Sequence, residues 1–195
     1  MPVRRRRHWI FDLDGTLTLP VHDFDGLRHA LGLPHGEPIL EAIARLRPDD
    51  AARTTRRLDG MELTLAERAQ PQPGAAPMLA ALRARGCRFG ILTRNSEANA
   101  LVTLRAAGLA EFFAPADVIG RETCAPKPSP DGITTLLLRW RTSAPEAVVV
   151  GDYLYDLQAG RAAGTATVLF DPQAAYRWRE HADLCIDRLA ALVQP

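Results

Sequence analysis

The sequence is poor in cysteine, lacks long apolar runs and carries almost no net charge. Its three cysteines, Cys87, Cys124 and Cys185, are far apart and form no CxxC pair, so neither a zinc site nor a disulfide framework is expected. No stretch approaches the ~20 consecutive apolar residues that span a bilayer. A formal net charge of +1 creates no overall field toward nucleic acid or a membrane. We therefore expect a cytoplasmic protein without nucleic-acid or membrane partners.

Lysine is also scarce. Lys127 is the only lysine, and all the other residues of the Lys and Arg total are arginines. Four arginines at 4–7 precede a short apolar run. Such a cluster can contact nucleic acid or a membrane, but a solvated lead-in to a buried strand is the more common case. The apolar run is too short for a secretory or twin-arginine signal and is interrupted by Asp12.

The length of 195 residues allows one sizeable core with an insertion. Helical patterns without an intervening strand cover residues 24–31, 39–46 and 50–69. Asp49 is predicted to cap the third of these helices, and a stiff Pro-Gln-Pro-Gly linker follows at 71–74. We expect a helical cap at 19–73, inserted into an α/β core domain formed by 1–18 and 74–195.

After residue 74 the pattern alternates between helices and strands. Strands are predicted at 87–92, 116–119, 147–150, 166–170 and 184–186. Helices are predicted at 77–85, 97–107, 133–141, 154–163 and 188–193, the second capped by Ser96. This alternation implies parallel βαβ units and a doubly wound, Rossmann-like, three-layer α/β sandwich.

Two carboxylates follow the first predicted strand, at Asp12 and Asp14 in HWIFDLDGTL. Residues two positions apart in an extended chain point to the same side. Like charges this close cost energy unless a cation or a proton lies between them, and hard carboxylate oxygens suit Mg²⁺. An ordinary Asp-rich turn is the alternative. Gly15 lets the chain turn sharply after the pair.

Two later strands also end in a polar residue, Thr93 and Asp152. The carboxyl ends of parallel strands share one edge of a sheet, so these side chains can converge with Asp12. Thr93 suits a phosphate oxygen, although it is alternatively an ordinary helix-entry threonine. Lys127 lies in a loop with three prolines, which lower the entropy lost when it is fixed, although most lysines are mobile surface groups.

Asp152 and Asp156 supply two further carboxylates beyond the strand at 147–150. Asp152 can complete a Mg²⁺ site, and Asp156 can support Lys127 or a metal-bound water. Alternatively, Asp152 caps the next helix and Asp156 is a first-turn acid favoured by the helix dipole. Both kinds of role can coexist.

Four stretches together resemble a known family. DLDGT at Asp12, ILT ending at Thr93, the KPSP loop at Lys127 and GDYLYD at Asp152 resemble the four signature motifs of the haloacid dehalogenase superfamily, in order and in spacing. The helical insertion after the first motif is similar to the cap of subfamily IA, which includes phosphoglycolate phosphatase-like hydrolases. At 19–73 it is shorter than many such caps.

The resemblance implies that Asp12 is a nucleophile that forms an aspartyl-phosphate. It implies that Asp14 protonates the leaving alcohol and then takes a proton from water. Thr93 and Lys127 would hold the phosphoryl group. Mg²⁺ would be bound by Asp12, the backbone carbonyl of Asp14 and Asp152.

The residue after Thr93 departs from the family pattern, in which it is often small or an amide. Arg94 is either an additional clamp for an anionic substrate group or a solvated charge. Asn95 and Asp156 are expected to support the site. Candidate cap contacts are His22, Arg28, Arg45, Arg53 and Arg56.

The expected activity is Mg²⁺-dependent hydrolysis of a small phosphorylated metabolite, with phosphoglycolate as the family-level example. Asp14 argues against the dehalogenase branch, which needs neither this acid nor a metal. A phosphosugar mutase and a non-catalytic phospholigand-binding or regulatory protein are the alternatives. The oligomeric state is left open as a monomer or a weak dimer, and the side chains that select the substrate are expected in the cap and loops.

Overall fold

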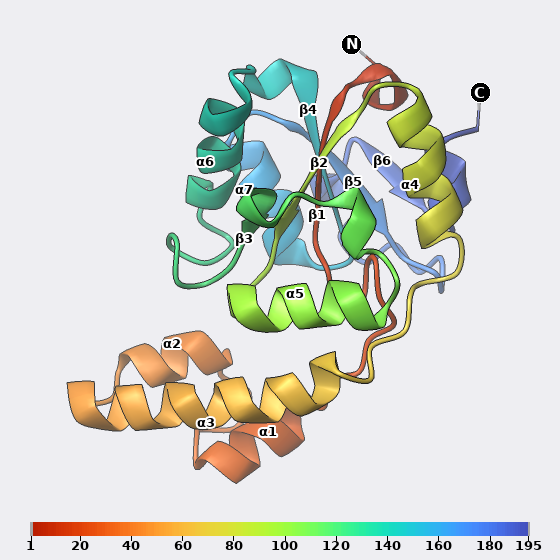
Figure 1. Cartoon of the computed structure of the whole chain (residues 1–195). Coiled ribbons are helices and arrows are strands. Elements are labelled where there is room, and N and C mark those ends of the chain that lie inside the picture. The colour runs from red at the N-terminus through yellow and green to blue at the C-terminus, as the bar shows by residue number, and fades with distance from the viewer. Residues whose placement is uncertain (1, 195) are drawn as a thin grey trace.

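The computed structural model describes residues 2–194 and contains a six-stranded sheet in the order β3-β2-β1-β4-β5-β6 (Figure 1). All neighbouring strands are parallel. The strands are β1 (His8–Phe11), β2 (Arg88–Leu92), β3 (Val118–Ile119), β4 (Ala147–Gly151), β5 (Ala166–Phe170) and β6 (Leu184–Ile186). Within residues 2–194, no helix is long and apolar enough to cross a membrane.

Helices cover both faces of this sheet. Helices α4 (Ala75–Ala84) and α5 (Glu97–Ala106) lie on one face, and α6 (Asp131–Trp140) and α7 (Leu154–Ala162) lie on the other. Trp9 and Phe11 pack into the core beneath α4 and α5, while the intervening Ile10 belongs to the core beneath α6 and α7. The predicted doubly wound, three-layer fold is therefore confirmed.

Strand β1 lies at the centre of the sheet. Phe11 is in register with Ile91 of β2 on one side and with Val150 of β4 on the other. Its apolar side chains are fully buried because both faces of a parallel sheet are covered, which explains an uninterrupted apolar run in place of alternation. The carboxyl ends of β1, β2 and β4 consequently open at one edge, where the polar residues follow.

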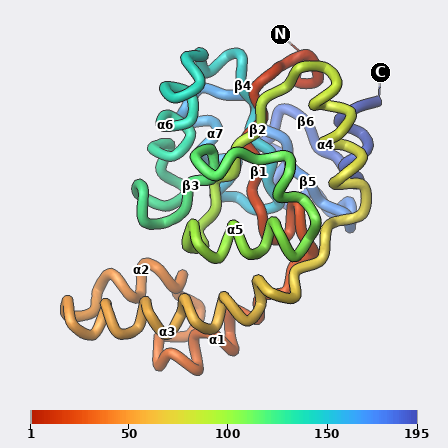
Figure 2. The backbone as a smooth tube through the Cα atoms, in the orientation of Figure 1, coloured from red at the N-terminus to blue at the C-terminus, as the bar shows by residue number. Residues whose placement is uncertain are grey.

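Three helices between β1 and α4 pack against one another beyond this edge, beside α5 (Figure 2). They are α1 (Phe24–Leu31), α2 (Ile39–Ala44) and α3 (Pro48–Ala66). Their own small apolar core contains Leu27, Leu31, Ile39, Ile43 and Leu58. The division into a cap at 19–73 and a core at 1–18 and 74–195 stays a prediction.

The chain enters and leaves this helical segment through two adjacent stretches of backbone. The amide of Leu19 donates to the carbonyl of Gln70 at 2.9 Å, and the amide of Gln72 donates to the carbonyl of Leu17 at 2.8 Å. Thr18 and Pro71 form an isolated antiparallel bridge between these bonds. The two crossings are therefore tied together by main-chain pairing.

Several predicted boundaries differ from the structure. Helix α3 begins at Pro48 with Arg47 as N-cap, so the prediction that Asp49 caps it is wrong. Proline suits the first helical position because no amide is needed there, and Asp49 instead lies in the first turn, where the helix dipole favours an acid. The predicted helix at 188–193 is only a 3₁₀ turn at Leu189–Leu192, and the third strand is shortened by a 3₁₀ turn at Pro115–Asp117.

Part of the arginine run has a structural role. The guanidinium of Arg6 donates to the carbonyl of Ala147 at 2.6 Å, and the carbonyl of Arg6 accepts from the indole of Trp9 at 3.0 Å. Arg6 therefore ties the start of β1 to the start of β4. Arg5 and Arg7 are exposed, as expected for a lead-in to the sheet.

Candidate active site

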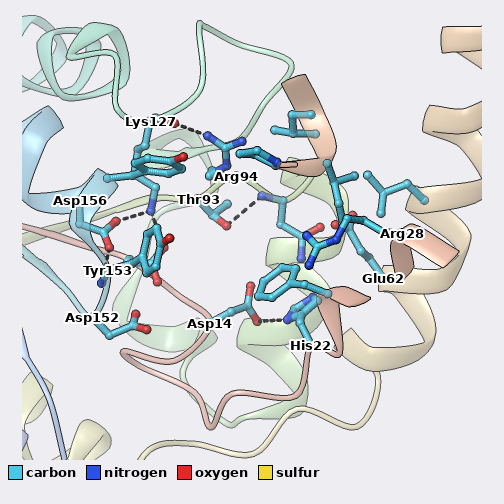
Figure 3. A pocket seen from close by; sticks show the side chains of 18 of the residues that line it. Asp14, His22, Arg28, Glu62, Thr93, Arg94, Lys127, Asp152, Tyr153 and Asp156 are labelled. Atoms are coloured by element: carbon cyan, nitrogen blue, oxygen red, sulfur yellow. Dashed lines mark hydrogen bonds and ion pairs between the residues drawn. The ribbon is translucent and has the colours of Figure 1, made fainter. Parts of the chain in front are cut away.

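Polar side chains from the ends of three strands line one cavity of about 430 Å³ (Figure 3). Asp12 follows β1, Thr93 follows β2 and Asp152 follows β4. Asp14 and Lys127 line the same cavity, the latter from the loop that precedes α6. The structure thus places the five principal residues of the sequence prediction together, while their chemical roles stay predictions.

Lys127 is buried between two carboxylates. Its side-chain nitrogen lies 2.5 Å from Oδ1 of Asp12 and 2.5 Å from Oδ1 of Asp156, and the residue is only 4% exposed. Burial alone would lower the pKa of Lys127, but the two carboxylates outweigh it and raise that pKa above its usual value. Lys127 is therefore a fixed ammonium group, and the interpretation as a mobile surface lysine is wrong.

Asp156 combines two of the functions considered from the sequence. Its Oδ1 contacts Lys127, and its Oδ2 accepts a hydrogen bond from the amide of Tyr153 at 3.1 Å, at the start of α7. Burial raises the pKa of Asp156 to about 6, although the charge of Lys127 opposes the increase. The first-turn acid of α7 and the contact with Lys127 coexist in this one side chain.

Asp152 is not the helix N-cap, since Tyr153 occupies that position. Its Oδ1 instead accepts from the hydroxyl of Thr16 at 2.7 Å, which joins it to the loop after β1. That loop passes close by at Gly15, which has a φ of +92° and where an added Cβ would lie 2.6 Å from Oδ2 of Asp152. Glycine is required there for both reasons.

The acidic residues of the cavity carry more negative charge than the protein neutralises. Oxygens of Asp12, Asp152 and Asp156 lie within 4.8 Å of one another, and Lys127 pairs with Asp12 and Asp156. Burial and the neighbouring carboxylates raise the pKa of Asp152 to about 8, and burial raises the pKa of Asp12. Three carboxylates facing one ammonium group fit an additional divalent cation with a preference for oxygen ligands, such as Mg²⁺.

Thr93 and Asn95 form a buried turn between β2 and α5. The hydroxyl of Thr93 accepts from the amide of Asn95 at 3.0 Å, and Oδ1 of Asn95 accepts from the amide of Ser96 at 2.9 Å. Since the Thr93 oxygen serves as an acceptor, its own proton is available for donation to a ligand. Asn95 thus takes part in the turn that holds Thr93, and its supporting role in the reaction stays a prediction.

Arg94 bridges the core and the helical insertion. One guanidinium nitrogen donates to the backbone carbonyl of Lys127, and the other donates to Oε2 of Glu41 in α2 at 2.6 Å. The guanidinium also lies over the ring of Tyr155, 5.1 Å from its centroid. Arg94 is therefore not a solvated charge, and its role as a clamp for an anionic substrate group stays a prediction.

Two of the five candidate cap residues line the cavity, namely His22 and Arg28. His22 stacks on Phe24 with ring centroids 5.5 Å apart, and its Nδ1 lies 4.0 Å from Oδ1 of Asp14. Arg28 reaches the cavity from α1 while its guanidinium donates to Asp25 at 2.7 Å.

The other three candidates do not line the cavity. Arg45, Arg53 and Arg56 are exposed to solvent. Arg45 pairs with Glu37 at 2.6 Å, and Arg53 pairs with Asp50. Only the inner face of the insertion can reach the cavity, and that face could not be identified from the positions of arginines alone.

Glu62 is a cavity residue that the sequence analysis missed, along with Tyr153 and Tyr155. It lies on the buried face of α3 with Leu58 and Ala66, at intervals of four residues. An acid at an apolar position of an amphipathic helix was the available signal.

The chain matches known proteins over most of its length. A family model described as haloacid dehalogenase-like hydrolase matches residues 7–164. A haloacid dehalogenase-like hydrolase domain-containing protein of Arabidopsis thaliana is 31% identical over 184 residues, which cover 88% of this chain and 74% of that protein. A phosphoglycolate phosphatase of Rhodospirillum rubrum is 35% identical over 191 residues, which cover 82% of this chain and 77% of that protein. The crystal structure of CbbY from Rhodobacter sphaeroides in complex with phosphate shares the fold, with a TM-score of 0.75, 24% identity and 96% coverage of each chain.

Proposed function

The chain belongs to the haloacid dehalogenase-like hydrolase family, as one of its phosphatases, and from this premise we propose that it hydrolyses small phosphorylated metabolites with the help of Mg²⁺. The observation that carries the proposal is the buried contact of Asp12 with Lys127, next to Asp152, at the carboxyl edge of the sheet. This arrangement joins a carboxylate nucleophile, a fixed cation and a further metal-binding carboxylate in one cavity.

In the first step, an oxygen of Asp12 attacks the phosphorus and the bond to the leaving alcohol breaks. Asp14 donates a proton to the departing oxygen, so that an alcohol leaves in place of an alkoxide. Burial disfavours the charged form of Asp12, and the ammonium of Lys127 opposes this effect. The same ammonium group and the hydroxyl of Thr93 are placed to hold the phosphoryl oxygens.

In the second step, water attacks the phosphorus of the aspartyl-phosphate on Asp12. Asp14, now a carboxylate, takes a proton from this water. The bond between phosphorus and the Asp12 oxygen breaks, which releases inorganic phosphate and restores the Asp12 carboxylate. The side chain of Asp14 is 19% exposed, which gives water access to it. Splitting the hydrolysis into two displacements replaces one difficult step by two easier ones.

The carboxylates of Asp12 and Asp152 and the backbone carbonyl of Asp14 would hold Mg²⁺. The ion supplies positive charge that offsets the charge on the transferring phosphoryl group. Both oxygens of Asp156 are already engaged by Lys127 and Tyr153, so Asp156 positions Lys127 and the start of α7.

Residues 19–73 would act as a cap that completes the cavity. Arg28 from α1, Ile39 from α2 and Glu62 from α3 all line the cavity that contains Asp12, which supports this part of the proposal. The chemistry then resides in the sheet edge, and the leaving group faces the cap. Phosphoglycolate is the first metabolite to test because it appears in the name of a relative.

The decisive experiment measures phosphate release from a panel of phosphorylated metabolites, with Mg²⁺ and with EDTA. We expect release only with Mg²⁺, and we expect Asp12→Asn to lower kcat by about a thousandfold or more. Thermal unfolding of the variant checks that it is folded. No release by folded, Mg²⁺-supplied protein would contradict the proposal, and turnover that requires an acceptor sugar would indicate a mutase.

A further inference from the structure

Glu62 is a buried acid in the cavity wall formed by the helical insertion. It is 8% exposed, and Figure 3 shows it with Arg28 on the side of the cavity opposite Asp152 and Asp156. Most of the surrounding wall is apolar, with Phe24, Pro38, Ile39, Leu40 and Leu58. A carboxylate in such a wall needs an explanation, because desolvation of a charge is costly.

Arg121 holds this carboxylate from behind the cavity. One guanidinium nitrogen donates to Oε2 of Glu62 at 2.8 Å and also to Asp59, and the other donates to the carbonyl of Arg94 at 3.1 Å. The side chain of Arg121 is 8% exposed, and Arg121 does not line the cavity. The loop after β3 thus fixes the position of Glu62 relative to the core.

The ion pair alone does not account for Glu62. Arg121 is already paired with Asp59, whose side chain is 39% exposed and therefore less costly to keep charged. Burial raises the pKa of Glu62, which means that its charged form pays a desolvation cost that Arg121 only partly offsets. Among residues 2–194, Arg121 provides the hydrogen bond to Oε2, and Oε1 accepts none. That oxygen is available to a ligand.

The guanidinium groups that line the cavity already have acidic partners. Arg28 pairs with Asp25 at 2.7 Å, and Arg94 pairs with Glu41 at 2.6 Å. Among the described residues of the insertion, Glu62 is the one carboxylate that lines the cavity, and it offers a hydrogen-bond acceptor with negative charge. Such a feature attracts a donor and repels a second anion.

On the basis of the proposed function, we infer that Glu62 determines specificity by accepting a hydrogen bond from a hydroxyl or ammonium group of the leaving alcohol. The substrate is then the phosphate monoester of a polyol or an amino alcohol. A phosphorylated hydroxy acid such as phosphoglycolate would bring its carboxylate toward Glu62 and is disfavoured.

Four short monophosphates test this inference in the presence of Mg²⁺. Glycerol 1-phosphate carries hydroxyl groups, phosphoethanolamine carries an ammonium group, ethyl phosphate carries neither, and phosphoglycolate carries a carboxylate. We expect kcat/KM of the wild type to be at least about tenfold higher for the better donor-bearing ester than for ethyl phosphate, with phosphoglycolate lowest.

Glu62→Gln removes the charge but keeps the size of the side chain. We expect it to lower kcat/KM for phosphoethanolamine by about tenfold, to raise it for phosphoglycolate and to leave ethyl phosphate within about twofold. Asp59→Asn is the matched control, because it removes the other acidic partner of Arg121 outside the cavity. It should leave the order of the four substrates unchanged.

Two results would overturn the inference while the proposed function stands: phosphoglycolate as the best wild-type substrate, or an equal effect of Glu62→Gln on all four esters. Absence of phosphate release from all four, by wild-type protein that unfolds cooperatively, would overturn the proposed function and this inference with it. The two failures are therefore distinguishable.

Discussion

The side-chain nitrogen of Lys127 lies 2.5 Å from Oδ1 of Asp12, although 115 positions separate the two residues in the chain. One follows the central strand β1, and the other lies in the loop before α6. The only lysine of the chain is thus committed to a buried contact with the carboxylate proposed as nucleophile. Because Lys127 is buried and held by two carboxylates, the fold itself restricts the conformational freedom of its side chain.

Replacement of Lys127 by methionine should therefore lower the stability of the protein. Lys127→Met leaves Asp12 and Asp156 buried without a counter-charge, so the free energy of unfolding should fall by about 3 kcal/mol. Urea denaturation in EDTA measures the loss. Arg83→Met is the control, since it removes a cation from an exposed pair with Glu111 and should cost under about 1 kcal/mol. Equal losses for the two variants would contradict the prediction.

Asp14→Asn should separate the two proposed proton transfers. With p-nitrophenyl phosphate, whose leaving group needs little protonation, we expect a burst of p-nitrophenol followed by turnover about a hundredfold slower than wild type. With ethyl phosphate the first step itself needs the acid, so no burst of ethanol is expected. Rapid-quench measurements of both products check this difference. A burst of the same size from both esters would argue against Asp14 as the acid.

Mg²⁺ should raise the melting temperature more at pH 8 than at pH 6. The pKa of Asp152 is raised from 3.8 to about 8, so without metal the folded state holds this proton better than the unfolded state, and stability falls as pH rises through that interval. Mg²⁺ competes with the proton and therefore binds more strongly as pH rises. Calorimetry with and without EDTA measures the effect. In Asp152→Asn, the fall in stability with rising pH and the growth of the Mg²⁺ effect with rising pH should both become weaker. If both stay as in the wild type, Asp152 is not the group responsible.

Arg94→Ala should destabilise the protein more than Glu41→Ala. Arg94 loses its contacts with Glu41, the carbonyl of Lys127 and Tyr155, for which we expect a cost of about 1–2 kcal/mol. Glu41 is 39% exposed and loses one ion pair, with a cost under about 1 kcal/mol. Urea denaturation of both variants and the double variant gives the coupling between them. If the losses in the free energy of unfolding are purely additive, the ion pair of Arg94 with Glu41 contributes nothing to stability.

The principal side chains of the site could be predicted from the sequence because parallel strands bring their carboxyl ends to one edge. Asp12, Thr93 and Asp152 each follow an apolar strand, so their convergence required only the fold class. These strands are short and are buried after His8 of β1 and Arg88 of β2, and their apolar runs are unambiguous for that reason. Lys127 was marked by its three neighbouring prolines rather than by any periodic pattern.

The cap side of the cavity could not be predicted in the same way. The periodicity of α3 identifies its buried face, but it does not reveal that Glu62 on this face meets Arg121 from a distant loop. The partner of Arg94 likewise depends on how α2 is placed against the core. The Asp49 error has a local cause, since two helix-start signals, a proline and an acid, are adjacent in the chain and the proline takes the first position.

The paired backbone crossings at Leu19–Gln70 and Leu17–Gln72 have an evolutionary consequence. Because the two ends of the helical segment already meet, insertions or deletions between them need not displace β1 or the loop that carries Asp12 and Asp14. Gene changes in this interval can therefore alter what enters the cavity while the phosphoryl chemistry is inherited intact. One α/β core can therefore acquire different substrate selectivities through changes confined to the segment between these crossings.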